Sequence, residues 1–401
     1  MLYGHGDNGY LHRQELLADF SSNVWYGGEP AGLKDHLFQR WQLINRYPEV
    51  LAESLTERVS RHHGLSPQNI LVNNGTTESI YLIAQLFKRK KASIVFPSFS
   101  EYEDACRMHE HSLQFLSWTE LENWIARLTP ELRITGLQPT EPGAINPGAT
   151  IFGADDPRAT GLHAISLGAT GLQSHPEDPA GQAPDHPAWL NTDLLWLGNP
   201  NNPTGAVLPA LATLIRQHPE IIFIVDEAFI EFTDSIESLA PLVPELPNLV
   251  ILRSLTKVFA IPGLRLGYVV GEEEMISRLR AFKLPWSVNA LALEAGNFIF
   301  DRHSRIRLPL ASLLQDKERF VRQLEEIGIK IQSSHTHFFL CDTGQEDAAE
   351  LQNFLLDRFR LLIRNAANFR GLGAGNFRLA TLSPDKNQWL INALKEWKEK
   401  K

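Results

Sequence analysis

Residues 253–268 read Arg-Ser-Leu-Thr-Lys-Val-Phe-Ala-Ile-Pro-Gly-Leu-Arg-Leu-Gly-Tyr, with Lys257 near the centre. The apolar residues 249–252, just before this segment, predict a buried strand. A Pro-Gly pair then predicts a turn, and residues 266–270 form a second apolar run. We therefore expect Lys257 to lie on a loop at the end of a strand.

Hydroxyl and guanidinium groups surround this lysine in the sequence. Ser254 and Thr256 supply the hydroxyls, and Arg253 and Arg265 supply the guanidinium groups. Such a set suits a site that holds a phosphate beside a reactive amine. A solvated lysine in a basic surface loop is the structural alternative, and Lys257 by itself does not separate the two interpretations.

Two further segments place polar groups at the ends of predicted strands. The segment Asn-Pro-Asn-Asn-Pro-Thr-Gly, which contains Asn202, follows the apolar residues 194–197. Asp226 follows the apolar residues 221–225, which are rich in β-branched side chains. Ligands of open parallel sheets bind outside the carboxyl ends of the strands, so we expect both side chains to converge with Lys257 on one crevice.

Together the three segments resemble the fold type I pyridoxal-phosphate enzymes, the group that contains the aspartate and histidinol-phosphate aminotransferases. The resemblance implies an α/β fold, with a large, mostly parallel sheet domain and a smaller α/β domain. It also implies that Lys257 bonds covalently to pyridoxal 5'-phosphate, that Asp226 pairs with the pyridine nitrogen, and that Asn202 contacts the phenolic oxygen. An aspartate at that nitrogen keeps the ring protonated, so the ring can accept electrons when a bond at the substrate Cα breaks.

The resemblance assigns further residues to the cofactor. A glycine-containing turn after the predicted strand 70–72 opens a helix expected over residues 79–88, and its free N–H groups would cradle the phosphate. An ordinary helix cap is the alternative for this turn. An aromatic residue after the predicted strand 94–96 would stack on the ring. The residues expected to bind the cofactor are Gly75, Thr76, Thr77, Phe99, Asn202, Asp226, Ser254, Thr256, Lys257 and Arg265, together with Tyr47 of a second subunit.

The placement of Tyr47 implies a homodimer, because by resemblance this residue reaches the cofactor phosphate of the neighbouring subunit. Arg378 lies in an apolar context, where an unpaired charge would be costly. A structural salt bridge would explain it, whereas the resemblance makes it the clamp for the substrate α-carboxylate. Asn23, Arg364 and His5 complete the expected substrate site.

Within this group the chain resembles the threonine-phosphate decarboxylases of cobalamin synthesis and, next to them, the histidinol-phosphate aminotransferases. Residues 19–23, 99–102, 285–292 and 362–369 carry much of the likeness. Phe229 stands where aminotransferases usually have a tyrosine, and phenylalanine cannot donate a hydrogen bond to the cofactor. The expected reaction is decarboxylation of L-threonine O-3-phosphate to (R)-1-aminopropan-2-ol phosphate, with an aminotransferase as the alternative. A cofactor-binding protein without catalysis is a third interpretation, which the retained lysine, aspartate and arginines disfavour.

Composition narrows the class of protein further. The net charge is −9 and the chain has no extended basic run, which argues against a nucleic-acid partner. Cys106 and Cys341 are expected to be buried thiols of a cytoplasmic protein. Neither a signal peptide nor an apolar run of roughly 20 residues is visible, so no membrane association is expected. No metal site is predicted.

The 401 residues are enough for two domains. We expect residues 49–285 to form the large cofactor-binding domain, and residues 1–48 and 286–401 to form the small one. Residues 129–190 hold nine of the 24 prolines, eight of the 27 glycines and no lysine, which is typical of an inserted low-complexity loop.

Overall fold

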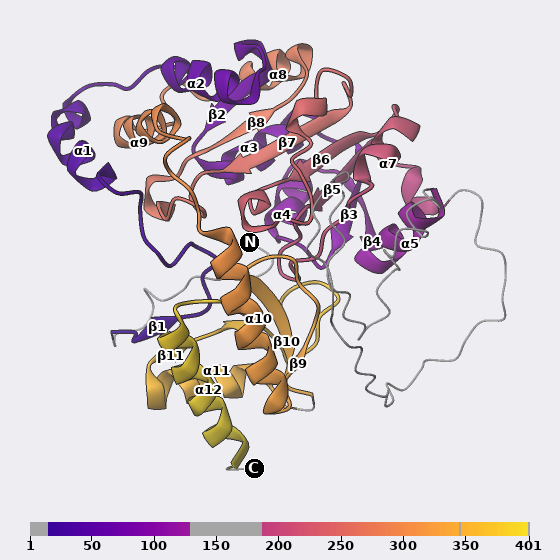
Figure 1. The fold of residues 1–401 in the computed structure, drawn as a ribbon. Coiled ribbons are helices and arrows are strands. Elements are labelled where there is room, and N and C mark those ends of the chain that lie inside the picture. Colours follow the sequence, from indigo (N-terminus) through magenta and orange to yellow (C-terminus); the bar gives the residue numbers. More distant parts are fainter. Residues whose placement is uncertain (1–14, 129–186, 345, 400–401) are drawn as a thin grey trace, which may run out of the picture.

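The computed structural model describes residues 15–128, 187–344 and 346–399, which form two α/β domains with separate hydrophobic cores (Figure 1). His5 lies outside the described residues, as does the expected insertion apart from its last four residues. The large domain occupies the upper part of Figure 1 and the small domain the lower part. The predicted fold class is confirmed.

A seven-stranded sheet forms the centre of the large domain, in the order β2, β8, β7, β6, β5, β3, β4. β8 runs antiparallel to both of its neighbours, and the other adjacent pairs are parallel. The strands span Ile70–Asn73 (β2), Lys91–Phe96 (β3), Ser112–Ser117 (β4), Leu194–Gly198 (β5), Ile222–Asp226 (β6), Leu249–Ser254 (β7) and Gly267–Val270 (β8).

The central strands are apolar on both faces because helices cover both sides of the sheet. Leu195, Phe223 and Ile251 belong to the core on one face. Their sequence neighbours Leu194 and Ile224 belong to the core on the other, as the alternation of side chains along a strand requires. Helices Glu53–His63 (α2), Trp118–Leu128 (α5), Leu211–Gln217 (α7) and Ala290–Asp301 (α9) contribute to the first core, and Gly75–Leu86 (α3), Glu101–Met108 (α4) and Glu273–Arg280 (α8) to the second.

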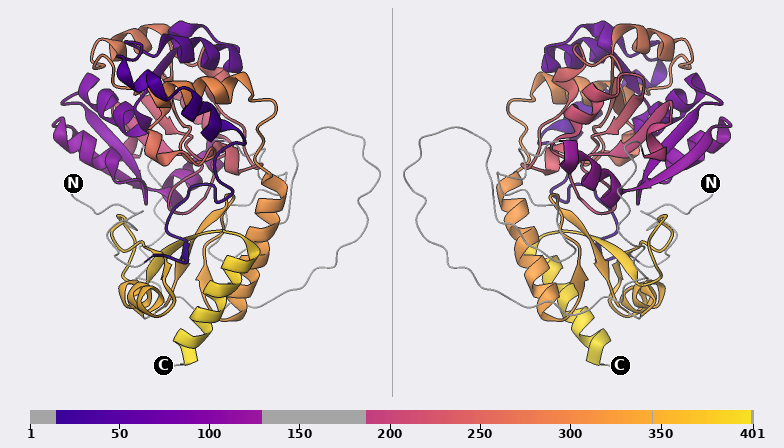
Figure 2. Two further views of the ribbon diagram at one scale, coloured as in Figure 1. Left: turned by 90° about the vertical axis from the view of Figure 1, so that its left-hand side faces the viewer. Right: turned by 90° about the vertical axis from the view of Figure 1, so that its right-hand side faces the viewer.

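The small domain is built on a four-stranded antiparallel sheet in the order β12, β13, β10, β9. Its helices pack together below the large domain in both views of Figure 2. The N-terminal strand β1 pairs in parallel with β11 and brings Phe20 into the small-domain core. The elements span Ala18–Asp19 (β1), Leu310–Glu326 (α10), Lys330–Ile331 (β9), Phe338–Asp342 (β10), Ala348–Phe359 (α11), Leu361–Leu362 (β11), Arg364–Asn365 (β12), Asn376–Ala380 (β13) and Pro384–Glu399 (α12).

Three helices differ from the sequence prediction. Helices Leu33–Gln39 (α1) and α9 were expected in the small domain, but Leu33 and Ala292 lie in the large-domain core. Helix α3 begins at Gly75 instead of residue 79, because the expected turn is already its first turn. Short 3-10 helices span Trp41–Asn45 (η2), Pro67–Asn69 (η3), Ala188–Leu190 (η4), Ile230–Phe232 (η5), Ala240–Leu242 (η6) and Pro262–Leu264 (η7).

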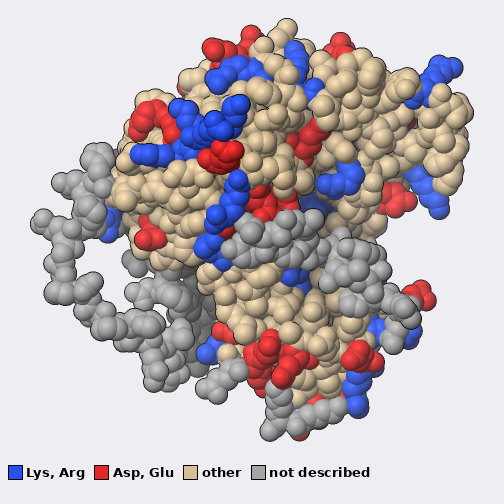
Figure 3. Space-filling view, turned by 180° about the vertical axis from the view of Figure 1, so that it is seen from behind, with Lys and Arg blue, Asp and Glu red and all other residues tan. Residues whose placement is uncertain are grey.

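The surface carries charges of both signs. Figure 3 shows lysine and arginine side chains interspersed with aspartate and glutamate across the back of both domains. Within the described ranges, no helix is both long enough and apolar enough to cross a bilayer.

Candidate active site

Three loops meet at the carboxyl edge of the central strands. Gly198 at the end of β5 pairs with Asp226 at the end of β6, and Asp226 pairs with Leu252 in β7. The loop that contains Asn202 leaves β5 on one side of Asp226, and the loop that contains Lys257 leaves β7 on the other. The fold therefore brings together the three strand ends that the sequence analysis singled out.

Asp226 is the last residue of β6, between β5 and β7, and is buried. Its carboxylate accepts hydrogen bonds from the Tyr102 hydroxyl at 2.8 Å and from the backbone N–H of Ala228 at 3.0 Å. Burial raises the pKa of Asp226 from 3.8 to about 6, although both hydrogen bonds and the charge of Lys257 act in the opposite direction. A cation placed against this carboxylate would stabilise its ionised form.

Tyr102 is a site residue that the sequence analysis did not identify. It is buried on α4, and its ring stacks on Trp196 with centroids 5.7 Å apart and meets the edge of Phe99 at 6.0 Å. The available signal was its position three residues after Phe99 in a segment that follows a strand end. A buried tyrosine needs a partner for its hydroxyl, and here that partner is Asp226.

Strand register assembles a candidate phosphate site. Gly267 in β8 pairs with Ser254 on one side and with Asn73 on the other, so the start of α3 lies beside the end of β7. The hydroxyls of Ser254 and Thr256 lie 2.9 Å apart. Thr76 and Thr77 occupy the first turn of α3, where free N–H groups and the helix dipole favour an anion.

Arg265 and Gly75 complete this candidate phosphate site. A Cβ added to Gly75 would lie 2.7 Å from Nη2 of Arg265, so only a glycine lets the guanidinium lie against the helix start. Gly75 itself has φ +77°, and Arg265 has φ +57°, a conformation that costs energy outside glycine and is common at functional sites.

Arg253 does not join the phosphate site, contrary to the expectation from its position near Lys257. Its buried guanidinium instead pairs with Glu231 at 2.5 Å and Glu227 at 3.2 Å. Arg253 and Ser254 are adjacent strand residues, so their side chains point to opposite faces of the sheet. Arg253 is therefore a structural ion-pair residue.

These groups fit pyridoxal 5'-phosphate. Lys257 supplies the amine, and Asp226 supplies a buried carboxylate whose raised pKa a protonated ring nitrogen would offset. The helix start at Gly75 with Arg265 and the two hydroxyls forms an anion cradle. Phe99, one turn from Tyr102, is the aromatic residue at the edge of the same site.

Arg378, which the resemblance assigns to the substrate carboxylate, is buried in β13. Its Nη1 donates to Oδ1 of Asn202 at 2.5 Å, and its Nη2 donates to the backbone carbonyl of Ser21 at 2.5 Å. The guanidinium also lies over the ring of Phe338, 5.7 Å from the centroid. Loops from both domains thus fix its orientation.

Asn23 is also buried, and among the described residues its side-chain Oδ1 has no hydrogen-bond partner. An orphaned buried amide is costly and calls for a ligand or water. Arg364 is half-buried, and burial lowers the pKa of its guanidinium to about 10. It lies over the ring of Phe369 at 5.1 Å.

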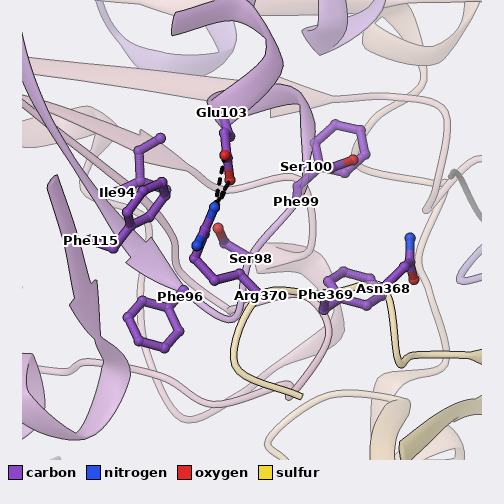
Figure 4. A pocket seen from close by; sticks show the side chains of 10 residues that line it. All are labelled: Ile94, Phe96, Ser98, Phe99, Ser100, Glu103, Phe115, Asn368, Phe369 and Arg370. Carbon is purple, nitrogen blue, oxygen red and sulfur yellow. Dashed lines mark hydrogen bonds and ion pairs between the residues drawn. The ribbon is translucent and has the colours of Figure 1, made fainter. Parts of the chain in front are cut away.

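A pocket beside Phe99 lies at the boundary between the two domains (Figure 4). Arg370 reaches from the small-domain loop to Glu103 on α4, with Nη2 2.8 and 3.0 Å from the two carboxylate oxygens. Its guanidinium also lies 3.7 Å from the ring centroid of Phe115. A Cβ added to Gly371 would lie 2.7 Å from Phe96, so the loop packs tightly against the large domain.

Tyr47 is not brought into the site of its own chain. The residue is 85% exposed, and its ring lies 5.1 Å from that of Trp286 on the outer surface. This position is compatible with a role toward a second subunit, which stays a prediction.

The fold and this constellation define a pyridoxal-phosphate enzyme of fold type I. The sequence matches the family described as Aminotransferase class I and II over residues 20–130 and 171–394. The chain therefore belongs to this family and is an enzyme, and its cofactor is pyridoxal 5'-phosphate.

Individual relatives have two kinds of activity in their names. The chain is 31% identical to the threonine-phosphate decarboxylase of Salmonella typhimurium over 388 residues, covering 95% of this chain and 91% of that protein. It is 28% identical to the histidinol-phosphate aminotransferase of Caldanaerobacter subterraneus over 357 residues, covering 88% and 84%. Among solved structures, the L-threonine-O-3-phosphate decarboxylase of Porphyromonas gingivalis has a TM-score of 0.77 at 31% identity, covering 96% of this chain and 100% of that chain.

Proposed function

We propose that this enzyme decarboxylates L-threonine O-3-phosphate to (R)-1-aminopropan-2-ol phosphate in cobalamin biosynthesis. The observation that carries the proposal is the strand register that places Arg364 opposite Arg378. The two residues are directly opposite each other in the β12–β13 ladder, so their side chains start from the same face about 5 Å apart. Two guanidinium groups in this arrangement would suit a ligand with two anionic groups. Threonine phosphate carries a carboxylate and a phosphate.

Relatives support the pathway. Besides the decarboxylases, a bifunctional protein of adenosylcobalamin biosynthesis from Leptospira interrogans is 24% identical over 384 residues, which is 95% of this chain and 38% of that protein. A putative threonine-phosphate decarboxylase of Caldanaerobacter subterraneus is 29% identical over 402 residues.

Each arginine has a distinct task in the proposed reaction. Arg378 holds the α-carboxylate by charge-assisted hydrogen bonds, and its contacts to Asn202 and Ser21 fix the plane in which it can do so. Arg364 binds the phosphate on the side chain of the substrate. Asn23 presents its buried amide to the same carboxylate.

Proton transfer falls to Lys257. Pyridoxal phosphate, when bound, accepts the electron pair released as a bond at the substrate Cα breaks. Loss of the carboxylate as CO2 would leave Cα in need of a proton, and the Lys257 amine would supply it. Asp226 keeps a positive charge at the ring nitrogen through its buried carboxylate, which Tyr102 orients.

An aminotransferase is the second candidate function, supported by the 28% identical relative. Phe229 favours decarboxylation over this alternative, because it offers no hydroxyl to the cofactor. Its ring is buried and packs edge-on against Phe338 with centroids 4.7 Å apart.

The test is CO2 release from L-threonine O-3-phosphate by the cofactor-loaded protein in the absence of a keto acid. We expect release that is lost in Lys257→Ala. Arg364→Met should raise KM for the phosphorylated substrate about ten- to hundred-fold, as expected for loss of a charge-assisted contact. Arg358→Met, on the exposed face of α11, is the matched control. Formation of glutamate from histidinol phosphate when 2-oxoglutarate is the acceptor, without CO2 release, would instead establish the aminotransferase.

We also propose that the enzyme is a homodimer with Tyr47 at the subunit interface. Tyr47, Trp286 and Val50 are exposed apolar residues that lie near one another. The ring of Tyr47 is 5.1 Å from that of Trp286, and the backbone N–H of Trp286 donates to the Val50 carbonyl at 3.0 Å. Phe38 and Trp41, which are also more than half exposed, stack on each other with ring centroids 6.3 Å apart. Such surfaces mark protein interfaces. Sedimentation equilibrium should give twice the chain mass, and Tyr47→Phe should weaken cofactor binding without changing that mass; a monomer would refute the proposal.

A further inference from the structure

Residues 20–25 run from the small domain to the loop that contains Lys257, and hydrogen bonds hold this segment at several points. The backbone carbonyl of Phe20 accepts from the Ala380 N–H at 2.9 Å. At the other end, the N–H of Trp25 donates to the carbonyl of Lys257 at 2.9 Å. This segment, which we call the Asn23 arm, therefore connects the substrate side of the site to the residue that bears the reactive amine.

His337 provides the contact at the centre of this arm. Its side chain is 1% exposed, and its Nε2 lies 3.1 Å from the backbone carbonyl of Asn23. A carbonyl can only accept, so Nε2 carries the hydrogen. The ring stacks on Phe232 with centroids 4.0 Å apart and meets Phe338 edge-on with centroids 5.4 Å apart.

The imidazole is neutral under ordinary conditions. Burial lowers the pKa of His337 to about 3, and the charges of Arg378 and Lys257 lower it further, against the effect of the Asn23 hydrogen bond. A neutral donor fastens the arm without placing a third positive charge beside these two cations. Its Nδ1 is buried and has no partner in the described part of the chain.

A hydrogen bond holds the backbone of the arm at Asn23 but not the Asn23 side chain. His337 holds the Asn23 carbonyl, while the Asn23 amide oxygen, buried next to it, is left without a partner among the described residues. A buried polar group is normally satisfied, and an exception calls for an explanation such as a bound water, ion or ligand. The backbone is thus held in place so that the amide can meet a ligand.

We propose that His337 is a positioning residue for decarboxylation: its Nε2–H holds the Asn23 arm so that the Asn23 amide and Arg378 face one substrate carboxylate. This inference rests on the proposed function for the identity of the ligand. The hydrogen bond from His337 to the arm does not depend on that identity.

Two substitutions separate the donor from the ring. His337→Phe keeps an aromatic ring between Phe232 and Phe338 but removes the donor. His337→Gln keeps an N–H at a similar distance from the backbone but removes the ring. If the hydrogen bond is what matters, His337→Phe raises KM for L-threonine O-3-phosphate roughly ten-fold, the cost of leaving a buried carbonyl unsatisfied, and His337→Gln stays within about three-fold of wild type.

Inhibition by 1-aminopropan-2-ol phosphate supplies the internal control. This amine has the phosphate but no carboxylate, so its inhibition constant should be unchanged in both variants. The proposal would be overturned if His337→Phe also bound the amine ten-fold more weakly. It would likewise be overturned, in favour of ring packing, if KM for the substrate rose equally in both variants.

Hydrogen exchange at the Trp25 amide gives a readout that needs no substrate. We expect faster exchange in His337→Phe than in wild type and wild-type exchange in His337→Gln, since this amide bonds to Lys257 at the end of the arm. Equal exchange in all three proteins overturns the inference even if the wild type decarboxylates. If the wild type releases no CO2 but the exchange pattern holds, the proposed function is wrong, although His337 still holds the arm.

Discussion

Asp226 should make the cofactor-free enzyme less stable at alkaline pH. Burial raises the pKa of its carboxyl from 3.8 to about 6, so the folded state binds a proton more tightly than the unfolded chain. Its contribution to stability is therefore fully present below pH 3.8 and is lost as the pH rises through about 6. At 1.36 kcal/mol per pKa unit, the whole contribution is about 3 kcal/mol.

Only part of this range is accessible without acid damage. Between pH 8 and pH 5, the same two pKa values give a gain of about 1.4 kcal/mol for the wild type. Asp226→Asn cannot titrate and has no such gain. Other titrating groups are common to both proteins and cancel in the difference, so the stability of the wild type relative to the variant should rise by about 1.4 kcal/mol on acidification.

Urea unfolding of the cofactor-free proteins at the two pH values measures this difference. Asparagine cannot accept from both Tyr102 and Ala228, so the variant carries a penalty that is the same at each pH and does not affect the comparison. Asp357→Asn, an exposed carboxylate on α11, is the control and should show no such change. The raised pKa of this carboxyl would be refuted if the free energy of unfolding of the wild type relative to Asp226→Asn were the same at both pH values, or if it fell on acidification.

Three further outcomes are expected. Lys257→Ala should abolish turnover and leave the circular dichroism spectrum unchanged; appreciable turnover would contradict the mechanism. A double-mutant cycle with Glu103→Gln and Arg370→Met should give a coupling energy of about 1 kcal/mol in urea unfolding, because the ion pair joins the domains but Arg370 is one-third exposed; zero coupling would mean that the pair contributes nothing. Burial lowers the pKa of His63 to about 3, so the folded state loses stability as the pH falls below 6.5. In the same unfolding assay, the free energy of unfolding of His63→Phe should rise by about 2 kcal/mol relative to that of the wild type when the pH is lowered from 8 to 5. A difference between the two proteins that does not change with pH would contradict this.

The sheet and the strand-end residues could be predicted because their signals are local. The runs before Asn202, Asp226 and Lys257 are apolar on every residue, which requires strands covered on both faces. Parallel neighbours then place their carboxyl ends together. The predicted strands at 194–197 and 249–252 lie within β5 and β7 as observed.

The partners of long side chains could not be predicted in the same way. Arg253 and Arg265 both lie close to Lys257 in sequence, but strand alternation turns Arg253 toward Glu227. Tyr102 became a site residue only through its contact with Asp226, 124 positions away. The division between the domains was also hidden, since the apolar face of α9 does not reveal which core it joins.

Contacts between residues far apart in the sequence also bear on which bond at the substrate Cα breaks. Bound pyridoxal phosphate would accept electrons in either reaction, so the outcome would depend on how this chain holds the substrate carboxylate. Lys257, Asp226 and Arg378 can serve both candidate reactions. The groups around Arg378 that fix its direction are Asn202, the Ser21 carbonyl and the arm that His337 holds. These contacts come from segments 176 and 357 positions away from Arg378, and 314 positions separate His337 from Asn23. We infer that reaction choice depends on how these remote segments pack against Arg378 more than on the residues that bind the cofactor.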